Sequence, residues 1–314
     1  MKQNKIKIVG KMLLFLSIIA AVVTYVNHAY VQTNYYKNLN SCYKFQIVPD
    51  EIEVANLGAS QAVYGMNYDV YDGYVSMNFA LAAQTLEYDY AVLKTYIDKM
   101  ADQSVIYIPI AVYSMYQQGD EIESIELRYY QFLSNENMPD WNLDDAIIYK
   151  YFPCLSAGSD IMYIFHDTEE LSEINEKLEN TYIEDDESRV CLGIKSAEIH
   201  QEYIGKQELS KQYDALIKII ELCKERNVTP ILLVTPYTQE YIDALGEDFW
   251  TQFRSDLNDL SMEYDCPLYD YTTSEFCQHA EYFNDTTHMN ENGSIAFSKD
   301  LLERTIMDGY LEEK

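Results

Sequence analysis

The chain has 314 residues, of which 48% are hydrophobic and 14% aromatic, enough to fill the core of one large domain or two small ones. Its 52 acidic and 22 basic residues give a formal net charge of −30, which repels phosphate backbones and argues against nucleic acid as a partner. Its 11 glycines and 7 prolines argue against a disordered or low-complexity majority.

The first 36 residues predict a membrane anchor. Lysines at positions 2, 5, 7 and 11 precede the apolar run MLLFLSIIAAVVTYV, and an uncharged stretch of about 20 residues reaches Val31, enough to span a bilayer. Basic residues before such a run keep that end in the cytoplasm. No small-x-small cleavage site follows, which favours a signal anchor over a cleaved signal peptide or a buried core helix. We therefore expect a single-pass protein of the cell membrane, with residues 1–36 as tip and anchor and 37–314 extracytoplasmic.

Beyond the anchor, strand and helix patterns alternate. Five apolar or alternating runs predict strands over 51–57, 74–81, 104–112, 228–236 and 266–271. Apolar residues at helical spacing predict helices over 84–102, 206–227, 250–260 and 290–307. This order predicts an α/β fold in which helices cover both faces of a parallel sheet.

An aromatic segment at about 119–205 interrupts this alternation. We expect it to be an insertion that forms a cap over one end of the sheet. Its aromatic residues are interpreted either as the core of the cap or as a platform on which sugar rings stack. The acidic run 184–187 is typical of a solvated loop.

Six cysteines form an even number, which suits an oxidising compartment. Cys266 and Cys277 are candidates for a disulfide around a short loop, whereas Cys223 lies in an apolar helical pattern typical of a buried thiol. The sequence does not decide the connectivity. No cysteine pair has metal-ligand spacing and no glycine-rich phosphate loop is present, so we expect neither a metal nor another cofactor.

The stretch EVANLGASQAVYGMNY, residues 53–68, places a serine directly after a strand pattern. Ser60 follows Gly58 and Ala59, the two smallest residue types. One interpretation is that Ser60 caps a helix through its hydroxyl. The other is chemical, because a serine at the carboxyl end of a strand faces the crevice where α/β sheets bind ligands.

A second pattern supports the chemical interpretation. Among the five histidines, only His288 has an acid three residues earlier, Asp285, in the segment YFNDTTHMNENG. A serine nucleophile needs a base, and the base needs a partner that fixes its tautomer. Both patterns follow strands of one sheet, so we expect Ser60, His288 and Asp285 to converge at its carboxyl edge. A surface loop followed by a helix cap at Asn290 is the alternative.

The order of Ser60 near the first strand and Asp-x-x-His before the last helix resembles the SGNH (GDSL-like) hydrolase superfamily. The anchor and NLGASQ, together with SMNFALAAQTLEYDY, PIAVYSMY and RYYQFL, resemble its membrane-anchored cell-envelope branch. That branch includes the D-alanyl-lipoteichoic acid protein DltD and alginate O-acetylation proteins. The resemblance covers roughly residues 50–310. It implies a three-layer flavodoxin-like fold with Ser60 as nucleophile, His288 as general base and Asp285 as its orienting partner.

The sequence departs from that family at two places. Ala59 replaces the acid of the usual Gly-Asp-Ser block, and no Gly-x-Asn-Asp block supplies an oxyanion-hole asparagine. We expect the Ser60 amide to be one oxyanion donor and Asn78, at the end of the second strand, to be another. His279 is the first candidate for the base if His288 is not.

The expected function is an extracytoplasmic serine esterase or acyltransferase that acts through an acyl-enzyme. The resemblance implies a cell-envelope polysaccharide or teichoic-acid-like polymer as substrate and a membrane O-acyltransferase as partner. The alternative is a non-catalytic envelope scaffold on the same fold, which binds a glycan or that membrane partner.

Overall fold

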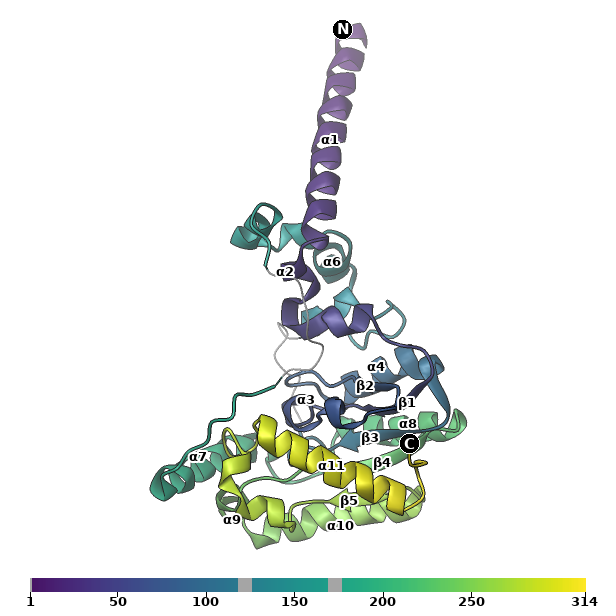
Figure 1. The fold of residues 1–314 in the computed structure, drawn as a ribbon. Coiled ribbons are helices and arrows are strands. Elements are labelled where there is room, and N and C mark those ends of the chain that lie inside the picture. The colour runs from purple at the N-terminus through teal and green to yellow at the C-terminus, as the bar shows by residue number, and fades with distance from the viewer. Residues whose placement is uncertain (1, 118–125, 169–176) are drawn as a thin grey trace. The chain divides into compact units, whose positions relative to one another are not determined.

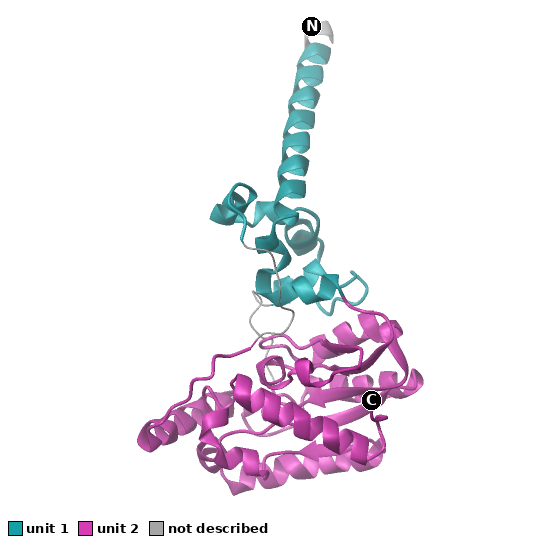
Figure 2. Ribbon diagram, in the orientation of Figure 1, with its two compact units in different colours: residues 1–47, 122–174 teal, residues 48–121, 175–314 magenta. Residues whose placement is uncertain are grey.

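The structure, a computed structural model, describes residues 2–117, 126–168 and 177–314. The chain divides into two compact units, which Figure 2 colours separately. The first comprises residues 1–47 and 122–174, and the second comprises residues 48–121 and 175–314. The expected insertion at about 119–205 is thus divided between the two units.

The second unit holds a parallel sheet that has five strands among the described residues. These are β1 (Ile52–Asn56), β2 (Ser76–Asn78), β3 (Met100–Pro109), β4 (Thr229–Val234) and β5 (Leu268–Asp270). They pair in the order β2-β1-β3-β4-β5, and every pair is parallel (Figure 1). This is the flavodoxin-like order of doubly wound folds. The predicted fold class is confirmed.

Helices cover both faces of this sheet (Figure 1). One face carries α3 (Ser60–Gly65) and α11 (Glu291–Met307), and the other carries α4 (Leu86–Tyr96), α8 (Lys211–Glu225) and α10 (Glu247–Glu263). On the first face Tyr107 of β3 and Thr305 of α11 share a buried hydrogen bond of 2.8 Å between their hydroxyl oxygens. On the second, Arg254 of α10 pairs with Asp270 of β5 at 3.1 Å. Cover on both faces explains why the central strands are continuous apolar runs.

Several predicted boundaries are wrong, since the strand expected over 74–81 is only Ser76–Asn78 and the helix expected over 206–227 begins at Lys211. The helix expected over 84–102 ends at Tyr96, and β3 already begins at Met100, four residues before the expected strand. The pairing of β1 with β3 is irregular there, running from Ile52 opposite Met100 to Val54 opposite Val105. Gln103, with φ +60°, lies in this irregularity. The apolar spacing does not reveal it, because a register shift depends on the partner strand.

The sheet unit also contains α7 (Asp186–Ile204), from the end of the expected insertion. This helix packs on α9 (Gln239–Leu245). Gly193 allows the close approach, because a Cβ atom there would lie 2.9 Å from the backbone carbonyl of Glu240. Arg189 pairs with the Glu240 carboxylate at 2.7 Å. The start of the helix also corrects a prediction, since Asp186 and Glu187 of the expected acidic loop are its first residues.

The first unit begins with α1 (Lys2–Val31). In the described part of the chain, its segment Lys5–Val31 alone is long and apolar enough to cross a membrane. The most apolar 18 residues of this segment have a mean hydropathy of 2.3, and none of them is buried in the protein. The other elements of this unit are short: α2 (Asn34–Lys37) and α6 (Leu143–Asp145), 3-10 turns at Leu39–Gln46, Leu127–Gln131, Pro153–Leu155 and Gly158–Ile164, and a π turn at Ala146–Tyr151.

Aromatic pairs join the two chain segments of the first unit. Tyr35 stacks on Tyr163 and Phe45 stacks on Phe132, each with ring centroids 3.8 Å apart. The aromatic residues of 122–174 differ in burial. Tyr129 and Tyr130 are buried, as core residues would be, whereas Trp141, Tyr151 and Phe165 are 39%, 47% and 73% exposed. A platform on which sugar rings stack stays a prediction.

The six cysteines are free thiols in the structure. Cys266 and Cys277, the candidate disulfide, are not bonded to each other, and the Cys277 thiol instead lies 3.3 Å from the Tyr271 carbonyl oxygen. Cys223 is fully buried, as its helical pattern predicts, and burial raises the pKa of its thiol.

Candidate active site

The turn between β1 and α3 has a shape that requires glycine. Gly58 has φ +113°, and a Cβ atom there would lie 2.9 Å from the Ala62 Cβ and 3.1 Å from the Pro109 Cβ. Ser60 begins the six-residue helix α3, whose N-cap position is Ala59 and has no side-chain cap. The interpretation of Ser60 as a helix cap is therefore wrong. Its hydroxyl is free to serve another partner.

That partner comes from the loop before α11. An antiparallel bridge between Phe283 and Met289 closes this loop, and the Asn284 amide donates to the His288 carbonyl at 2.9 Å. Inside it, Asp285 Oδ1 accepts from the backbone amides of Thr287 and His288, at 2.8 and 2.9 Å. The Asp285 carboxylate thus caps the turn formed by its own next three residues, as aspartate side chains commonly do.

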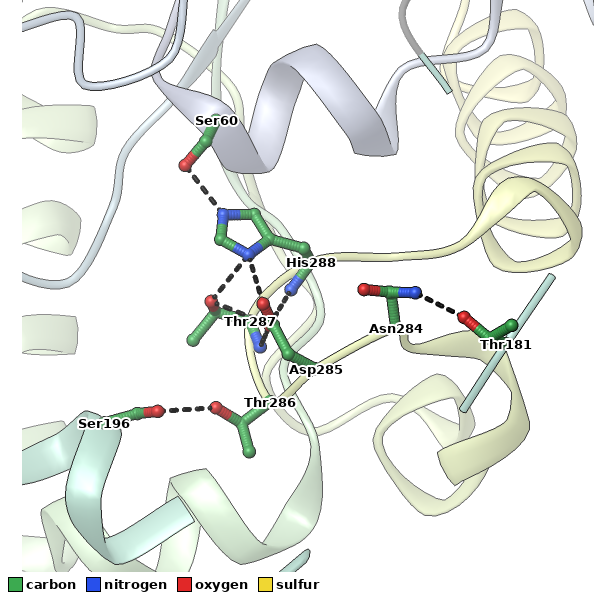
Figure 3. Close-up of polar contacts among 8 residues, drawn as sticks. All are labelled: Ser60, Thr181, Ser196, Asn284, Asp285, Thr286, Thr287 and His288. Atoms are coloured by element: carbon green, nitrogen blue, oxygen red, sulfur yellow. Dashed lines mark hydrogen bonds and ion pairs between the residues drawn. The ribbon is translucent and has the colours of Figure 1, made fainter. Parts of the chain in front are cut away.

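The three predicted side chains meet in one hydrogen-bonded line (Figure 3). His288 Nε2 lies 2.7 Å from Ser60 Oγ, and His288 Nδ1 lies 2.8 Å from Asp285 Oδ2. A carboxylate at Nδ1 favours the tautomer whose proton is on that nitrogen, which leaves Nε2 to accept the Ser60 hydroxyl proton. The arrangement is that of a nucleophile, a base and an orienting acid.

The electrostatics of Asp285 suit this arrangement. Burial opposes ionisation, but hydrogen bonds from the His288 ring and from the Thr287 and His288 amides outweigh it, so the pKa of Asp285 lies below its usual value. The side chains of His288 and Asp285 are 23% and 40% exposed. The site is therefore open to solvent and to a substrate while its carboxylate stays charged.

Neighbouring elements hold this loop from outside. Thr286 Oγ1 donates to Ser196 Oγ of α7 at 3.0 Å (Figure 3), and the Thr286 carbonyl accepts from the Thr238 amide at 3.1 Å. The Tyr64 ring of α3 meets the His288 ring edge-on, with centroids 5.6 Å apart. These contacts are not evident from the sequence, because Ser196 and Tyr64 carry no local pattern that points to the loop.

The expected oxyanion donors differ in their surroundings. Asn78 is buried, its Oδ1 accepting from Asn56 Nδ2 and from the Ala80 amide, each at 3.0 Å. Its Nδ2 donates to the Ala62 carbonyl at 3.3 Å. The Ser60 amide has no acceptor among the described residues. The oxyanion role of both groups stays a prediction, and only the Ser60 amide is left unengaged by the fold.

The other histidines near this edge have different partners. His279 Nδ1 lies 3.0 Å from Glu281, and both side chains are about half exposed. His200 of α7 lies 2.5 Å from the Tyr241 hydroxyl, and burial lowers the pKa of His200 to about 4. Within the described residues, His288 is the histidine that contacts Ser60.

No metal site is evident in the described part of the chain, where no cluster of three or more His, Cys, Asp or Glu side chains is placed to hold an ion.

The sequence matches no family model and no curated protein. The solved structures that resemble this chain include two proteins from Bacteroides species. One is a "putative acylhydrolase" from Bacteroides fragilis, which is 12% identical with a TM-score of 0.43. The match covers 88% of this chain and 99% of the Bacteroides fragilis chain. A GDSL-like lipase from Bacteroides thetaiotaomicron is 10% identical, with TM-score 0.41, covering 88% and 98%. The activities in those names belong to those two proteins.

Proposed function

We propose that the protein is a serine-dependent enzyme that cleaves or transfers O-acyl groups. The observation that supports this is the line from Ser60 Oγ through both nitrogens of His288 to Asp285, with contacts of 2.7 and 2.8 Å. Such a line activates a hydroxyl that is otherwise a poor nucleophile at neutral pH.

In the first step, Ser60 Oγ attacks the ester carbonyl carbon while His288 Nε2 takes the hydroxyl proton. The oxyanion that forms is stabilised by amide donors, of which the Ser60 N–H is the candidate in this chain. The tetrahedral intermediate then collapses, the C–O bond to the leaving alcohol breaks, and His288 returns the proton to that oxygen. Water or an acceptor hydroxyl reverses these events on the acyl-enzyme and regenerates Ser60.

More particularly, we propose an enzyme of the cell envelope, a membrane-anchored esterase or acyltransferase of polysaccharide or teichoic-acid-like polymers. The apolar segment Lys5–Val31 supports the anchor, and the lysines before it support a cytoplasmic N-terminus. A transferase of this kind needs an acyl donor delivered to its side of the membrane. A membrane O-acyltransferase is the partner that fits this need.

A fluorophosphonate probe tests the chemical proposal, because it labels serines activated by a base. We expect the wild-type protein to be labelled and Ser60→Ala to be unlabelled with the same melting temperature. Ser159→Ala, an exposed serine of the first unit, serves as the labelled control. A folded wild-type protein that resists the probe would instead favour a non-catalytic scaffold that binds a glycan or the membrane partner.

The acceptor distinguishes hydrolysis from transfer. Incubation of the purified protein with an acetyl ester and a short glycan should release acetate in the first case and give acetylated glycan in the second. Loss of both products in Ser60→Ala would assign them to this site.

Protease protection tests the topology. Protease added to intact cells or protoplasts is expected to digest residues 37–314, and to spare them only when the membrane orientation is the reverse. A tag at the N-terminus should remain protected until the membrane is lysed.

A further inference from the structure

A buried carboxyl group lies behind the turn that carries the candidate nucleophile. Asp89, in the first half of α4, is 1% exposed. Its Oδ1 accepts a hydrogen bond of 2.8 Å from the backbone amide of Gly58, two residues before Ser60. Asp89 plays no part in the chemistry described above.

A short segment clamps both polar groups of the Gly58 residue. The Leu81 amide donates to the Gly58 carbonyl at 3.2 Å, while Asp89 accepts from the Gly58 amide. Gln84 Nε2 supports the clamp, donating to Asp89 Oδ1 at 2.6 Å and to the Phe79 carbonyl at 3.2 Å. With its N–H and its C=O both held, Gly58 has little freedom to rotate, and so has the turn leading to Ser60.

Among the described residues, no cation balances the charge of this carboxyl group. The pKa of Asp89 is raised to about 7 by burial, against the opposing effect of the bonds from Gly58 and Gln84, and no charged side chain contributes. Glu87, on the same helix, pairs instead with Lys211 of α8 at 3.4 Å. An amide side chain would accept the same bonds without the cost of burying a charge.

The charge has one clear local effect. A hydrogen bond to an ionised acceptor is roughly twice as strong as one to a neutral acceptor. When Asp89 loses its proton, its grip on the Gly58 amide tightens, and Gly58 is the residue whose backbone sets the direction of the turn. The turn in turn sets where Ser60 Oγ lies, 2.7 Å from His288 Nε2.

We propose that Asp89 is a positioning residue for the nucleophile, whose carboxylate holds the Gly58 amide and so keeps Ser60 aligned with His288. This inference rests on the proposed function, since it concerns the reactivity of Ser60. It adds a residue whose contribution depends on its protonation, although Asp89 itself touches neither substrate nor base.

The test compares fluorophosphonate labelling of Ser60 in four proteins: wild type, Asp89→Asn, Asp89→Leu and Glu87→Gln. Asp89→Leu removes the acceptor at similar size, and Asp89→Asn keeps an accepting oxygen without a charge. Glu87→Gln changes an acid of the same helix and is expected to label like wild type. The maximal labelling rate and the probe affinity are measured separately, and folding is followed by circular dichroism.

We expect Asp89→Leu to lower the maximal rate by about 10- to 100-fold, in line with the effect of misplacing a reacting group, while the probe affinity stays the same. We expect the ratio of wild-type to Asp89→Asn rates to rise several-fold between pH 5.5 and 8.5. The His288 requirement is common to both proteins and cancels in this ratio.

A folded Asp89→Leu protein with the wild-type maximal rate would overturn the inference and leave Asp89 a structural residue. If Asp89→Leu does not fold, the ratio of wild-type to Asp89→Asn labelling rates decides instead. A ratio that stays constant from pH 5.5 to 8.5 would also overturn the inference. Failure of the wild-type protein itself to label is a different outcome, because it contradicts the proposed function.

Discussion

Two carboxyl groups support the two sides of the candidate site in opposite ways. Asp89 lies behind the Ser60 turn, is fully buried, and has its pKa raised to about 7 because burial dominates. Asp285 lies behind His288, is 40% exposed, and has its pKa lowered because the ring and two amides stabilise the charge. The same residue type is thus tuned in opposite directions by its surroundings.

The comparison shows that the two sides are built differently. The serine side is fixed by close packing at Gly58, which has no room for a Cβ atom beside Ala62, and by the buried hydrogen bond from the Gly58 amide to Asp89. The histidine side is fixed by polar contacts to Asp285, Thr287 and the backbone of its own loop. Mutation of Gly58 should therefore act through shape, and mutation of Asp285 through charge and tautomer.

The largest expected effect is on the histidine side. Asp285→Asn should keep the fold but lower ester hydrolysis by about 10⁴-fold, as the corresponding change does in a serine protease, because an amide can stabilise the wrong tautomer. His288→Ala should cost a similar factor, and the double variant little more, since the members of one catalytic unit are not additive. If both single variants keep near-wild-type rates while Ser60→Ala is inactive, His288 is not the general base. His279 would then be the first residue to test in that role.

On the serine side, Gly58→Ala should act through shape. The positive φ of +113° costs an alanine about 1–3 kcal/mol of strain, and the new Cβ would displace Ala62. We expect a lower melting temperature together with about a 100-fold loss of activity, because the turn moves Ser60. Gly246→Ala is the matched control, with φ +83° but no atom within 4 Å. It should lose stability and keep the activity of its folded fraction.

The pH dependence of stability should separate the two carboxyls. The pKa of Asp89 is raised in the folded state, so its stabilising contribution is greatest below the unfolded value near 3.9 and is lost as pH rises to about 7. As the pH rises through this window, the free energy of unfolding of Asp89→Asn, measured by denaturant melts, should increase relative to that of wild type by at most about 4 kcal/mol. Asp285 has the opposite sign, since its contribution is present above the unfolded pKa and disappears in acid. If the free energies of unfolding of wild type and Asp89→Asn change with pH in parallel, the pKa of Asp89 is the same in the folded and unfolded states, and this prediction is wrong.

The smallest effect concerns the outer support of the histidine loop. Ser196→Ala removes the hydrogen bond to Thr286, which is worth about 0.5–1.5 kcal/mol. We expect a rate loss of a few-fold in ester hydrolysis and a small drop in melting temperature. A loss as large as that of Asp285→Asn would mean that α7 does more than hold the loop.

The parts of the structure that local sequence determines were predictable. Apolar runs and helical spacing predict the five strands and the helices α4, α8, α10 and α11 of the sheet unit, because burial on one or two faces imposes those patterns. The convergence of Ser60, Asp285 and His288 was also within reach. The glycine turn and the Asp-x-x-His spacing are short segments, of which the first directly follows β1 and the second lies between β5 and α11.

What depends on distant partners was not predictable. The early start of β3 follows from its irregular pairing with β1, and the docking of α7 follows from Gly193 against Glu240. Asp89 was hidden for the same reason, as one acid in a helical pattern whose buried face is known only when Gly58 is placed beside it. Asn78 looked available because its partners, Asn56 and Ala62, are unknown until the strands pair.

The sequence separation of the reacting pair has a consequence for folding. Ser60 and His288 are 228 residues apart, and the sheet unit that holds them is interrupted by residues 122–174 of the other unit. Contacts of such long range form late and slowly, because the intervening chain loses entropy before the contact stabilises it. During synthesis the serine turn can pack against β3 long before the histidine loop exists. The nucleophile therefore remains without its base until the C-terminal part of the sheet unit is complete, so that a partly made chain carries no reactive serine.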